Sequence, residues 1–580
     1  MRKLLCYLKD YKKETIISPL FKMLEASFEL FVPLVMASMI DIGIKTSNSK
    51  HILTMGCILI FLGLIGLVCS LTAQYYAAKA SVGFGTKLRM ALFSHINSLS
   101  YSEIDSVGTS TLITRITNDI NQIQSGVNLV LRLFLRSPFI VFGAMIMAFT
   151  VNVKAALVFV VAIPLLALVV FGIMLACIPL HRKVQSRLDD VLRITRENLS
   201  GARVIRSVCR QEQEKEIFDK ANDELVAIQT FVGKISAFLN PVTYIIVNIA
   251  LLVIIYLGGL EVDSGVITQG EVIALVNYMS QILIELVKLA NLIITFTKSL
   301  ACAHRINEVF DLKTSVTEKP NCIDTHTGVT SNEPIIEFRN VSFSYKGAKE
   351  HSLNNVSFIA KRGETIGIIG GTGSGKSTLI NLIPRFYDAT EGNVLFYGKD
   401  VTHYSLHALR NKIGIVPQKA VLFKGTLRDN MKWADKNATD EMILQAIRTA
   451  QAEEIVASKA DGLDFMIQQN GSNLSGGQKQ RFTIARALVR QPDILILDDS
   501  SSALDFATDA KLRTAIRTAT TDMTVFIVSQ RATTIKDADQ IIVLDDGEVA
   551  GIGTHSQLLK SCDTYKEICL SQLSEKEVNA

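Results

Sequence analysis

The first 300 residues contain long apolar stretches separated by short or strongly charged segments. A bilayer needs about 20 apolar residues for each spanning helix, and six stretches reach that length. Residues 181–234 are rich in Lys and Arg, whereas neither residue occurs between Lys234 and Lys288. By the positive-inside rule, this asymmetry predicts that both termini lie in the cytoplasm. We expect spans near residues 16–40, 53–75, 130–151, 155–179, 238–260 and 272–297.

The segments 76–129 and 180–237 are too long for simple turns and keep the spacing of a helix, as at Ile113, Ile116 and Ile120. They predict that spanning helices continue beyond the lipid. About 20 additional helical residues would extend roughly 30 Å into the cytoplasm.

Few ionisable residues occur inside the predicted spans. Glu25 and Glu29 share one face of the first span, and Arg132 and Arg136 share a face of the third. We expect the arginines to snorkel toward the interface. The two carboxylates either line a substrate cavity or pair with Lys288 or another span.

The pattern changes after residue 312, where a polar segment, residues 313–334, predicts a linker. Beyond it, short β-rich runs alternate with helical segments, which predicts an α/β domain with a largely parallel sheet. We therefore expect a membrane domain at 1–312 and a nucleotide-binding α/β domain at 335–580. The predicted strands include Ile335–Phe338, Thr365–Ile369, Ile413–Val416, Ile494–Leu497, Thr524–Val528 and Ile541–Leu544.

Composition supports this division. The 580 residues have 20% charged residues, against roughly 25% in an ordinary soluble domain, which argues against a wholly water-soluble protein. The net charge of +5 is too small for this length to indicate a nucleic-acid partner. The nine cysteines form no CxxC pair, so a zinc or redox motif is not indicated.

A glycine-rich segment follows the predicted strand Thr365–Ile369 and precedes a predicted helix, the context that a phosphate-binding loop requires. Its backbone N–H groups would converge on phosphate, Lys376 would contact the β- and γ-phosphates, and Ser377 would ligate Mg²⁺. Further along, Asp498 ends an apolar strand and is placed to hold the same Mg²⁺. The predicted loop comprises Gly370, Gly371, Thr372, Gly373, Ser374, Gly375, Lys376, Ser377 and Thr378.

A second motif, LSGGQ, begins a predicted helix. Ser475 and Gln478 have the spacing of a capping box, in which Ser475 is the N-cap and Gln478 is N3. The two glycines leave N–H groups open, which also predicts an anion site. The motif comprises Leu474, Ser475, Gly476, Gly477 and Gln478.

Together these motifs resemble ATP-binding cassette (ABC) transporters, specifically the half-size bacterial exporters of the heterodimeric multidrug type, over nearly the whole chain. The resemblance implies six transmembrane helices fused to a cytoplasmic P-loop domain, and two such domains that enclose ATP between one chain's phosphate loop and the other's LSGGQ. It also implies coupling helices near residues 106–116 and 201–214.

The resemblance further assigns roles to single residues. Tyr345 corresponds to the aromatic residue that stacks on adenine, and Gln418 to the residue that contacts Mg²⁺ and the membrane coupling. Ser502 and Asp505 correspond to the D-loop at the interface between the two cassettes.

Two positions depart from the family's pattern. Asp499 stands where the catalytic glutamate is expected, and Gln530 stands where the switch histidine is expected. Aspartate withdraws the carboxylate by roughly 1.5 Å, and glutamine cannot carry a proton to the γ-phosphate. We therefore expect weak hydrolysis at this chain's own site and a second half-transporter subunit that retains both residues.

The expected function is ATP-driven export of hydrophobic or amphipathic small molecules across the cytoplasmic membrane by alternating access, with ATP and Mg²⁺. Alternatives are a subunit of a lipid or peptide exporter and a regulatory or channel-like subunit, whereas six spans argue against a soluble ATPase. Glu25 and Glu29 favour cationic hydrophobic substrates, because buried carboxylates attract positive charge.

Overall fold

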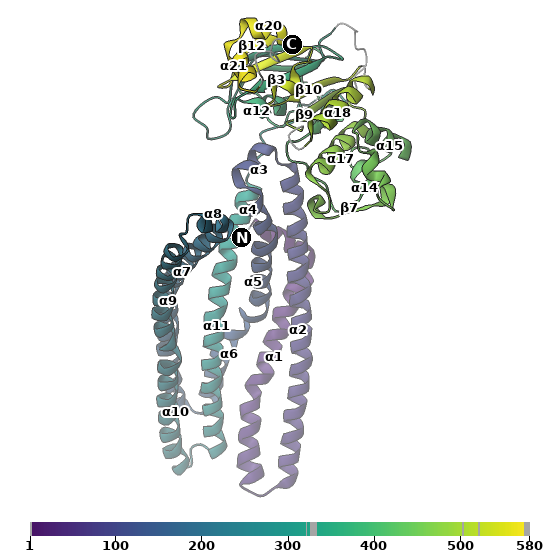
Figure 1. The fold of residues 1–580 in the computed structure, drawn as a ribbon. Helices are drawn as coiled ribbons and strands as arrows, with labels where there is room; N and C mark the ends of the chain where they lie inside the picture. The colour runs from purple at the N-terminus through teal and green to yellow at the C-terminus, as the bar shows by residue number, and fades with distance from the viewer. Residues whose placement is uncertain (1–2, 321, 325–332, 501–503, 520–521, 573–580) are drawn as a thin grey trace. The chain divides into compact units, whose positions relative to one another are not determined.

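The computed structural model describes residues 3–320, 322–324, 333–500, 504–519 and 522–572. The chain forms two units, the first comprising Met1–Asn97 and Ser110–Asp311, and the second comprising Ser98–Thr109 and Leu312–Ala580. The second unit therefore includes helix α3 (Tyr101–Val107), although α3 lies between two spans in the sequence (Figure 1).

The described part of the first unit contains six helical stretches that are long and apolar enough to cross a membrane, which confirms the predicted spans. They run from Leu4–Ile44, Ser49–Ser98, Thr109–Val151, Val153–Ser200, Gln211–Asp263 and Gln269–Phe310. Their principal helices are α1 (Lys12–Ser38), α2 (Ser49–Ser98), α4 (Thr109–Thr114), α5 (Ile120–Leu133), α6 (Arg136–Val151), α7 (Val153–Ser200), α8 (Ala202–Ser207), α9 (Gln211–Ala237), α10 (Leu239–Asp263) and α11 (Gln269–Phe310).

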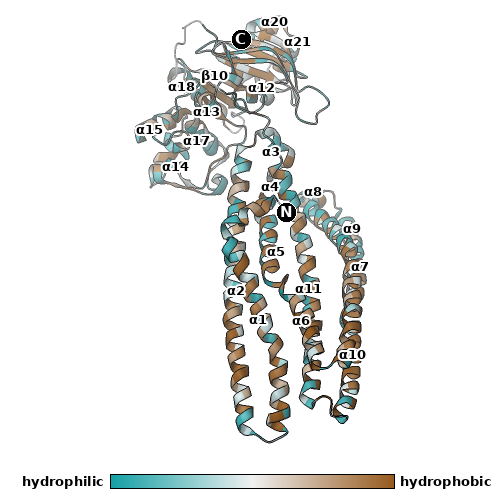
Figure 2. Cartoon of the chain, turned by 180° about the vertical axis from the view of Figure 1, so that it is seen from behind, coloured by the Kyte–Doolittle hydropathy of each residue, from teal (hydrophilic) through white to brown (hydrophobic). Residues whose placement is uncertain are grey.

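The long helices exceed the thickness of a membrane, as the sequence predicted. Helix α2 has 50 residues, which corresponds to about 75 Å at 1.5 Å per residue, against roughly 30 Å of hydrocarbon. Hydrophobic residues colour most of their length in Figure 2, and hydrophilic residues gather toward the end that carries α8. The polar extensions account for the long segments between the predicted spans.

Small residues allow the helices of the first unit to pack closely. Ala26, Ala144, Ala156 and Ala274 are fully buried in one apolar cluster shared by α1, α6, α7 and α11. Side chains this small let helix backbones approach one another, so dispersion contacts replace the hydrophobic drive that lipid cannot supply.

The second unit contains a six-stranded sheet in the order β12-β11-β3-β10-β9-β6. All neighbouring pairs are parallel except β11 with β12, which confirms the predicted α/β fold. The strands are β3 (Thr365–Gly370), β6 (Ile413–Val416), β9 (Ile494–Asp498), β10 (Thr524–Val528), β11 (Gln540–Asp545) and β12 (Glu548–Gly553).

One predicted strand lies elsewhere. The run at Ile335–Phe338 forms part of β1 (Ile336–Phe343), which belongs to a separate antiparallel sheet in the order β2-β1-β4-β5. No helix connects β1 to β2, and parallel neighbours would require a long crossover. The other strands of this sheet are β2 (Leu353–Ala360), β4 (Glu391–Phe396) and β5 (Lys399–Asp400).

Both faces of the six-stranded sheet are buried. Along β10, Val525 and Ile527 join one apolar cluster, and Phe526 and Val528 join the other. This burial explains why the strands are continuous apolar runs in the sequence.

The helices of the second unit, besides α3, are α12 (Lys376–Leu382), α13 (Leu406–Asn411), α14 (Leu427–Lys432), α15 (Asp440–Thr449), α16 (Glu453–Ala457), α17 (Gly476–Val489), α18 (Phe506–Ala519), α19 (Ala532–Ile535), α20 (His555–Ser561) and α21 (Asp563–Gln572).

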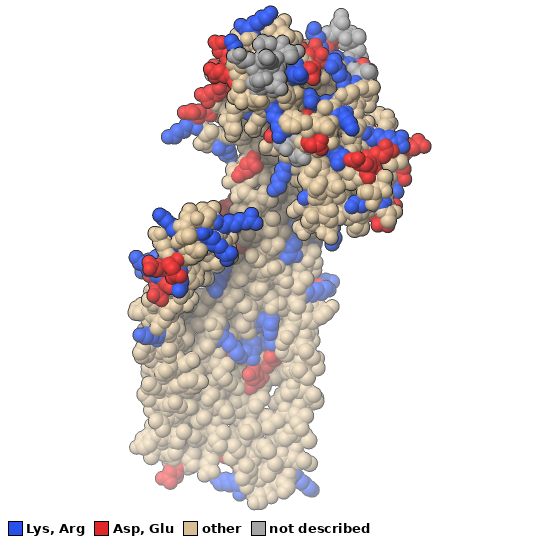
Figure 3. Space-filling view, viewed as in Figure 1, with Lys and Arg blue, Asp and Glu red and all other residues tan. Residues whose placement is uncertain are grey.

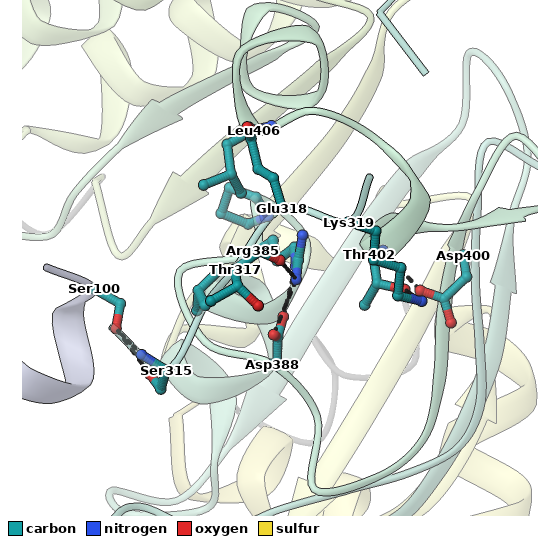
Figure 4. A network of polar contacts seen from close by, with 12 residues as sticks. Ser100, Ser315, Thr317, Glu318, Lys319, Arg385, Asp388, Asp400, Thr402 and Leu406 are labelled. Atoms are coloured by element: carbon teal, nitrogen blue, oxygen red, sulfur yellow. Dashed lines mark hydrogen bonds and ion pairs between the residues drawn. The ribbon is translucent and has the colours of Figure 1, made fainter. Parts of the chain in front are cut away.

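The described start of the predicted linker is docked on the second unit (Figure 4). The carbonyl of Thr317 accepts a hydrogen bond from Arg385 at 2.9 Å. The carboxylate of Glu318 accepts one from the backbone N–H of Leu406 at 2.7 Å, and Lys319 donates to Thr402 at 2.8 Å. These contacts hold residues 317–319 against the second unit, although the composition of this segment predicted only a linker.

Helix α3 contacts the same region. The hydroxyls of Ser100 and Ser315 lie 2.8 Å apart. Tyr387 donates its hydroxyl to Asp105 at 2.6 Å, and the ring centroids of Tyr101 and Phe386 lie 4.5 Å apart. The polar and aromatic contacts together explain why α3 belongs to the second unit.

Candidate nucleotide-binding site

The second unit contains a cavity of about 700 Å³ beside the carboxyl ends of β3, β9 and β10. Parallel α/β sheets bind ligands at this edge, because loops diverge there and helix N-termini point toward it. The lining residues include Tyr345, His351, Thr372, Gly373, Gly375, Lys376, Ser377, Thr378, Gln418, Asp498, Asp499, Gln530 and Gly547.

The phosphate loop runs from the end of β3 to the start of α12. Gly373 and Gly375 have φ angles of +89° and +91°, which other residues rarely adopt. A Cβ at Gly375 would also lie 2.6 Å from the carbonyl oxygen of Ser352. The Lys376 ammonium donates to the carbonyls of Gly370 and Gly371 at 2.9 and 2.5 Å. Burial lowers the pKa of Lys376, so a bound anion would stabilise its charged form.

The residues predicted to hold Mg²⁺ lie in this cavity. The hydroxyl of Ser377 donates to Asp498 at 3.2 Å, and Gln418 also lines the cavity. A hydroxyl, a carboxylate and an amide are oxygen ligands suited to Mg²⁺, which keeps several positions for water and phosphate. The described residues include no cluster of three His, Cys, Asp or Glu side chains that could form a metal cage by themselves. The donor set therefore fits a nucleotide-bound Mg²⁺.

Asp499 and Gln530, the two departures from the family's pattern, both line the same cavity. Asp499 follows β9 with a φ angle of +42°, and its backbone N–H donates to the carbonyl of Val528 at 3.0 Å. The side-chain amide of Gln418 donates to its carboxylate at 3.3 Å. The cavity thus combines a complete phosphate loop with Asp499, which is shorter than glutamate, and Gln530, which has an amide in place of an imidazole.

Tyr345 borders the cavity from the segment that follows β1. Its hydroxyl lies 3.1 Å from the hydroxyl of Thr378, and its ring meets those of Phe343 and Tyr387 edge to face at 4.9 and 5.4 Å. These contacts orient an aromatic side chain that remains 36% exposed. The exposed part is available for stacking on a planar ring.

The LSGGQ segment forms the capping box that the sequence predicted. The Ser475 hydroxyl accepts from the Gln478 N–H at 3.3 Å, and the Gln478 side chain accepts from the Ser475 N–H at 3.1 Å. A Cβ at Gly476 would meet no atom within 4 Å. This chain's fold therefore does not require a glycine there, whereas close approach of a ligand would. Among the described residues, the cavity lining does not include the segment.

The predicted D-loop is described only in part, because Ser502 lies outside the described residues. Asp505 accepts hydrogen bonds from the backbone N–H and hydroxyl of Thr508 at 2.8 and 2.9 Å. It therefore caps the start of α18, a local role that the sequence analysis did not identify.

The cavity also includes residues that the sequence analysis missed. Lys349 and Glu350 lie in the connection between β1 and β2, and Asp546 lies in the tight turn between β11 and β12. The Asp-Gly pair at this turn is a recognisable signal for a turn. Its place beside the phosphate loop depends on β11 pairing with β3.

Both intramembrane acids pair with bases, but only Glu29 pairs with another span, which was one of the predicted alternatives, whereas the partner of Glu25 lies on its own helix. Glu25 contacts Lys22 at 2.6 Å, and Glu29 contacts Arg136 at 2.6 Å. The expectation that Arg136 snorkels is wrong, because its side chain is 9% exposed and also contacts Glu285 at 2.6 Å. Two carboxylates hold this guanidinium inside the helix bundle.

The helices at the predicted coupling segments are short. α4 occupies residues 109–114, within the expected 106–116, and α3 occupies residues 101–107, just before it. α8 occupies residues 202–207, within the expected 201–214.

Comparison with known protein families gives two matches along the chain. Residues 15–286 match the ABC transporter transmembrane region, and residues 353–502 match the ABC transporter family. The first match corresponds to the spans, and the second includes the phosphate loop and the LSGGQ segment.

Several curated proteins are similar over most of the chain. An uncharacterized ABC transporter ATP-binding protein, YfiB, of Bacillus subtilis is 38% identical over 99% of both chains. A putative multidrug export ATP-binding/permease protein, YgaD, of the same organism is 32% identical over 98% of both. An ATP-dependent lipid A-core flippase of Desulfotalea psychrophila is 33% identical over 82% of both.

A solved structure shares the fold. The structure of a bacterial Atm1-family ABC exporter with ATP bound superimposes with a TM-score of 0.78, covering 97% of this chain and 99% of that one. The sequence identity is 23%, so the likeness concerns the fold.

Proposed function

Because this chain belongs to the ABC transporter family, we propose that it is one half of an ATP-driven exporter of amphipathic molecules. The observation that supports this proposal most directly is the fusion of six membrane-capable helices to a cavity built on a phosphate loop. The protein is a multi-pass membrane protein, and the basic loop at 181–234 supports cytoplasmic termini.

In the proposed cycle, ATP binds between this chain's phosphate loop and the LSGGQ segment of a second cassette. The Lys376 ammonium leaves the loop carbonyls to contact phosphate oxygens, and Tyr345 stacks on adenine. Mg²⁺ held by Ser377, Asp498 and Gln418 would neutralise charge on the phosphates. Closure of the cassettes would turn the substrate cavity outward, and hydrolysis would reset it.

The second half is proposed to be a different chain. Asp499 and Gln530 weaken hydrolysis at this chain's own site, whereas Leu474–Gln478 keeps its capping box and open glycine for the opposite site. A homodimer would contain two weak sites. A heterodimer would combine one ATP-retaining site with one competent site that uses this chain's LSGGQ.

Purification of the tagged chain from its native host tests the pairing. We expect a second half-transporter subunit with the catalytic glutamate and switch histidine to copurify. We also expect Gly477→Asp to abolish most of the ATPase activity, because it blocks the competent site, and Asp499→Asn to change it little. A chain that assembles alone and has brisk Mg-ATPase in both sites contradicts this proposal.

The substrate class is proposed as amphipathic, with a lipid or peptide exporter as the alternative. The argument for cationic substrates loses its support, because Glu25 and Glu29 already have basic partners. ATP-dependent accumulation against a gradient in vesicles that contain both subunits would separate a pump from a channel-like subunit. Passive flux that ATP merely gates would favour the channel-like function.

A further inference from the structure

The end of α21 contacts the loop that carries Gln530, residues 529–532, here called the switch loop. The side-chain amide of Gln572 donates to the carbonyl oxygen of Gln530 at 2.7 Å. Its side-chain oxygen accepts from the backbone N–H of Ala532 at 2.9 Å. Gln572 follows Gln530 by 42 positions in the sequence. One side chain, here called the clamp, thus holds the backbone of the switch loop through both a donor and an acceptor.

The core of the second unit holds α21 in place. Tyr565 and Cys569 are fully buried, and they belong to the same apolar cluster as Ala532 and Ile535 of α19. Gln572 follows these two residues of α21 by seven and three positions. Residues with this spacing share one face of a helix, so the clamp lies on the buried face of α21. Core packing therefore determines where its amide lies.

The remainder of the switch loop is held by other contacts. The hydroxyl of Ser529, a buried residue, accepts from the backbone N–H of Arg531 at 3.0 Å. The guanidinium of Arg531 lies over the ring of Phe506 in α18, 5.2 Å from its centroid. Gln530, between these two loop residues, lines the nucleotide cavity. The clamp therefore completes the support of the loop residue that faces the candidate site.

The identity of Gln530 makes this support important. It stands where the resemblance to ABC transporters places a switch histidine that acts on the γ-phosphate. Glutamine can donate a hydrogen bond to a phosphate oxygen but carries no charge. A neutral hydrogen bond weakens steeply with distance and angle, whereas the attraction between charges extends further. Recognition by an amide thus depends more strongly on where the loop backbone lies.

Helix capping explains only one of the two clamp contacts. α19 begins at Ala532, and its N-cap residue, Arg531, makes no side-chain cap. The contact from Gln572 to the Ala532 N–H therefore satisfies a free N–H of the helix start. The carbonyl of Gln530 precedes the N-cap and takes no part in the helix. The second contact consequently requires another explanation.

The clamp contains no charged group. Figure 3 shows Lys, Arg, Asp and Glu atoms spread over the visible face of the second unit. Both clamp contacts, in contrast, join a neutral side-chain amide to neutral peptide groups. Salt screens interactions between exposed charges. An effect of the clamp should therefore persist at high ionic strength, whereas an effect transmitted through surface charge should not.

We propose that Gln572 is a positioning residue of the nucleotide site, which holds the Gln530 backbone so that the Gln530 amide recognises the γ-phosphate of ATP. This inference rests on the proposed ATP-binding function and adds a residue of α21 to it. ADP has no γ-phosphate. Loss of the clamp therefore weakens binding of a nucleoside triphosphate and spares that of a diphosphate.

Nucleotide binding to the assembled two-subunit transporter, with the partner's phosphate-loop lysine replaced, tests this assignment. Displacement of a fluorescent ATP analogue gives the Kd of Mg-ADP and of Mg-AMP-PNP, a triphosphate that is not hydrolysed. We expect Gln572→Ala to raise the Kd of AMP-PNP by about 5-fold, the worth of one net hydrogen bond, and that of ADP by less than about 2-fold. High ionic strength should not remove this difference.

Gln572→Glu separates positioning from capping. Its carboxylate can still accept from the Ala532 N–H but cannot donate to the carbonyl of Gln530. The variant should therefore keep the melting temperature of the unmodified protein and still bind AMP-PNP about 5-fold more weakly. It also decides the question if Gln572→Ala does not assemble.

Two further variants test the route of the effect. In a protein that already carries Gln530→Ala, Gln572→Ala should not raise the Kd of AMP-PNP further, because the residue through which it acts is gone. Gln557→Ala is the matched control, since it removes the same type of amide from α20, where its oxygen accepts from the Thr554 N–H at 2.9 Å. It should change neither Kd.

Equal changes in the Kd of AMP-PNP and ADP would overturn the assignment while leaving ATP binding intact. An unchanged Kd of AMP-PNP in Gln572→Glu, or a further increase when Gln572→Ala is added to Gln530→Ala, would also overturn it. Failure of the unmodified transporter to bind either nucleotide would instead contradict the proposed function itself.

Discussion

At the scale of single residues, the candidate site departs from the family's pattern at two side chains, Asp499 and Gln530. Asp499 lies in a left-handed turn that directs it into the cavity, where it contacts Gln418. The backbone places an acid beside the phosphate loop, and the side chain of this acid is one methylene shorter than that of glutamate. Gln530 occupies the lining after β10 but has no titratable group.

We predict that Asp499→Glu combined with Gln530→His raises ATP hydrolysis at this chain's site by about 10-fold or more. The added methylene advances the carboxylate by roughly 1.5 Å, and misplacement of about 1 Å can cost on the order of 100-fold in rate. The measurement is steady-state Mg-ATPase with the partner's phosphate-loop lysine replaced. Asp499→Asn is the control, and an unchanged rate in the double variant would refute the explanation.

The half-buried carboxyl of Asp498 predicts a dependence of stability on pH. Burial raises the pKa of Asp498 above its ordinary value, so the charged form destabilises the nucleotide-free fold at pH values above that raised pKa. Asp498→Asn should therefore be more stable than the unmodified protein at pH 8. The difference should shrink as pH falls through the raised pKa and disappear below about 4, the pKa of an unfolded aspartate.

The single tryptophan of the chain, Trp433, lies in the second unit. Its fluorescence during thermal unfolding, without nucleotide, reports the stability of that unit. Equal melting temperatures for Asp498→Asn and the unmodified protein across pH 4–8 would contradict the prediction.

At the scale of elements, helix N-termini serve both the fold and the candidate chemistry. α12 begins at the phosphate loop, α17 begins with the LSGGQ capping box, and α18 begins at Asp505. Each start has backbone N–H groups that lack helical partners, and a side chain or an anion can satisfy them. A short motif at a helix N-terminus is therefore recognisable in the sequence, because the same local backbone geometry serves helix capping and anion binding.

We predict that Asp505→Ala lowers the free energy of unfolding of the second unit by about 1 kcal/mol, because α18 loses its cap. Asp505→Asn should keep most of that stability, since asparagine is an equally good N-cap. Denaturant unfolding followed by Trp433 fluorescence measures both variants. If Asp505→Asn lowers ATPase activity while its stability is unchanged, the carboxylate has a role in the D-loop beyond capping. Equal stability of Asp505→Ala and the unmodified protein would contradict the capping role.

Helix α3 shows how packing reassigns an element. Its residues belong to the second unit, where Tyr101 and Asp105 contact Phe386 and Tyr387. The sequence pattern predicts these residues only as part of the helical segment 76–129 that continues a span. The residues that it meets lie about 280 positions later in the chain.

At the scale of the whole molecule, charge is distributed according to the surrounding solvent. Exposed ion pairs occur in both units, such as Arg187–Glu224 in the first and Arg428–Asp464 in the second, whereas Arg136 lies buried between Glu29 and Glu285 among the long helices. Exposed pairs contribute up to about 1 kcal/mol, but loss of one member of a buried pair leaves an uncompensated charge.

We predict that Arg136→Gln destabilises the protein by about 3–5 kcal/mol, because Glu285 loses a buried partner. Combining it with Glu285→Gln should restore part of that loss. Arg187→Gln removes an exposed partner of Glu224 at 3.0 Å and should cost less than about 1 kcal/mol. Thermal unfolding of the solubilised protein, followed by labelling of buried cysteines, measures all three. A double variant that is less stable than Arg136→Gln would contradict the pairing.

The sequence alone determined the features that depend on local pattern. Continuous apolar runs predicted six spans and the strands of a buried sheet, because lipid and a two-faced core both exclude polar groups. The glycine-rich loop and the Ser475 capping box were also predictable, because a few neighbouring residues set their backbone geometry.

Tertiary structure decided the features that depend on distant partners. Whether Glu29 lines a cavity or pairs with a base depended on Arg136, over a hundred positions away, and the same contact kept Arg136 from the interface. The assignment of β1 to an antiparallel sheet and the contacts of Thr317 and Ile323 with Arg385 and Tyr404 likewise depended on pairing across the fold. The periodicity of the sequence predicts on which face of its own helix or strand a side chain lies. The energy of a buried charge depends instead on which other charges the fold places beside it.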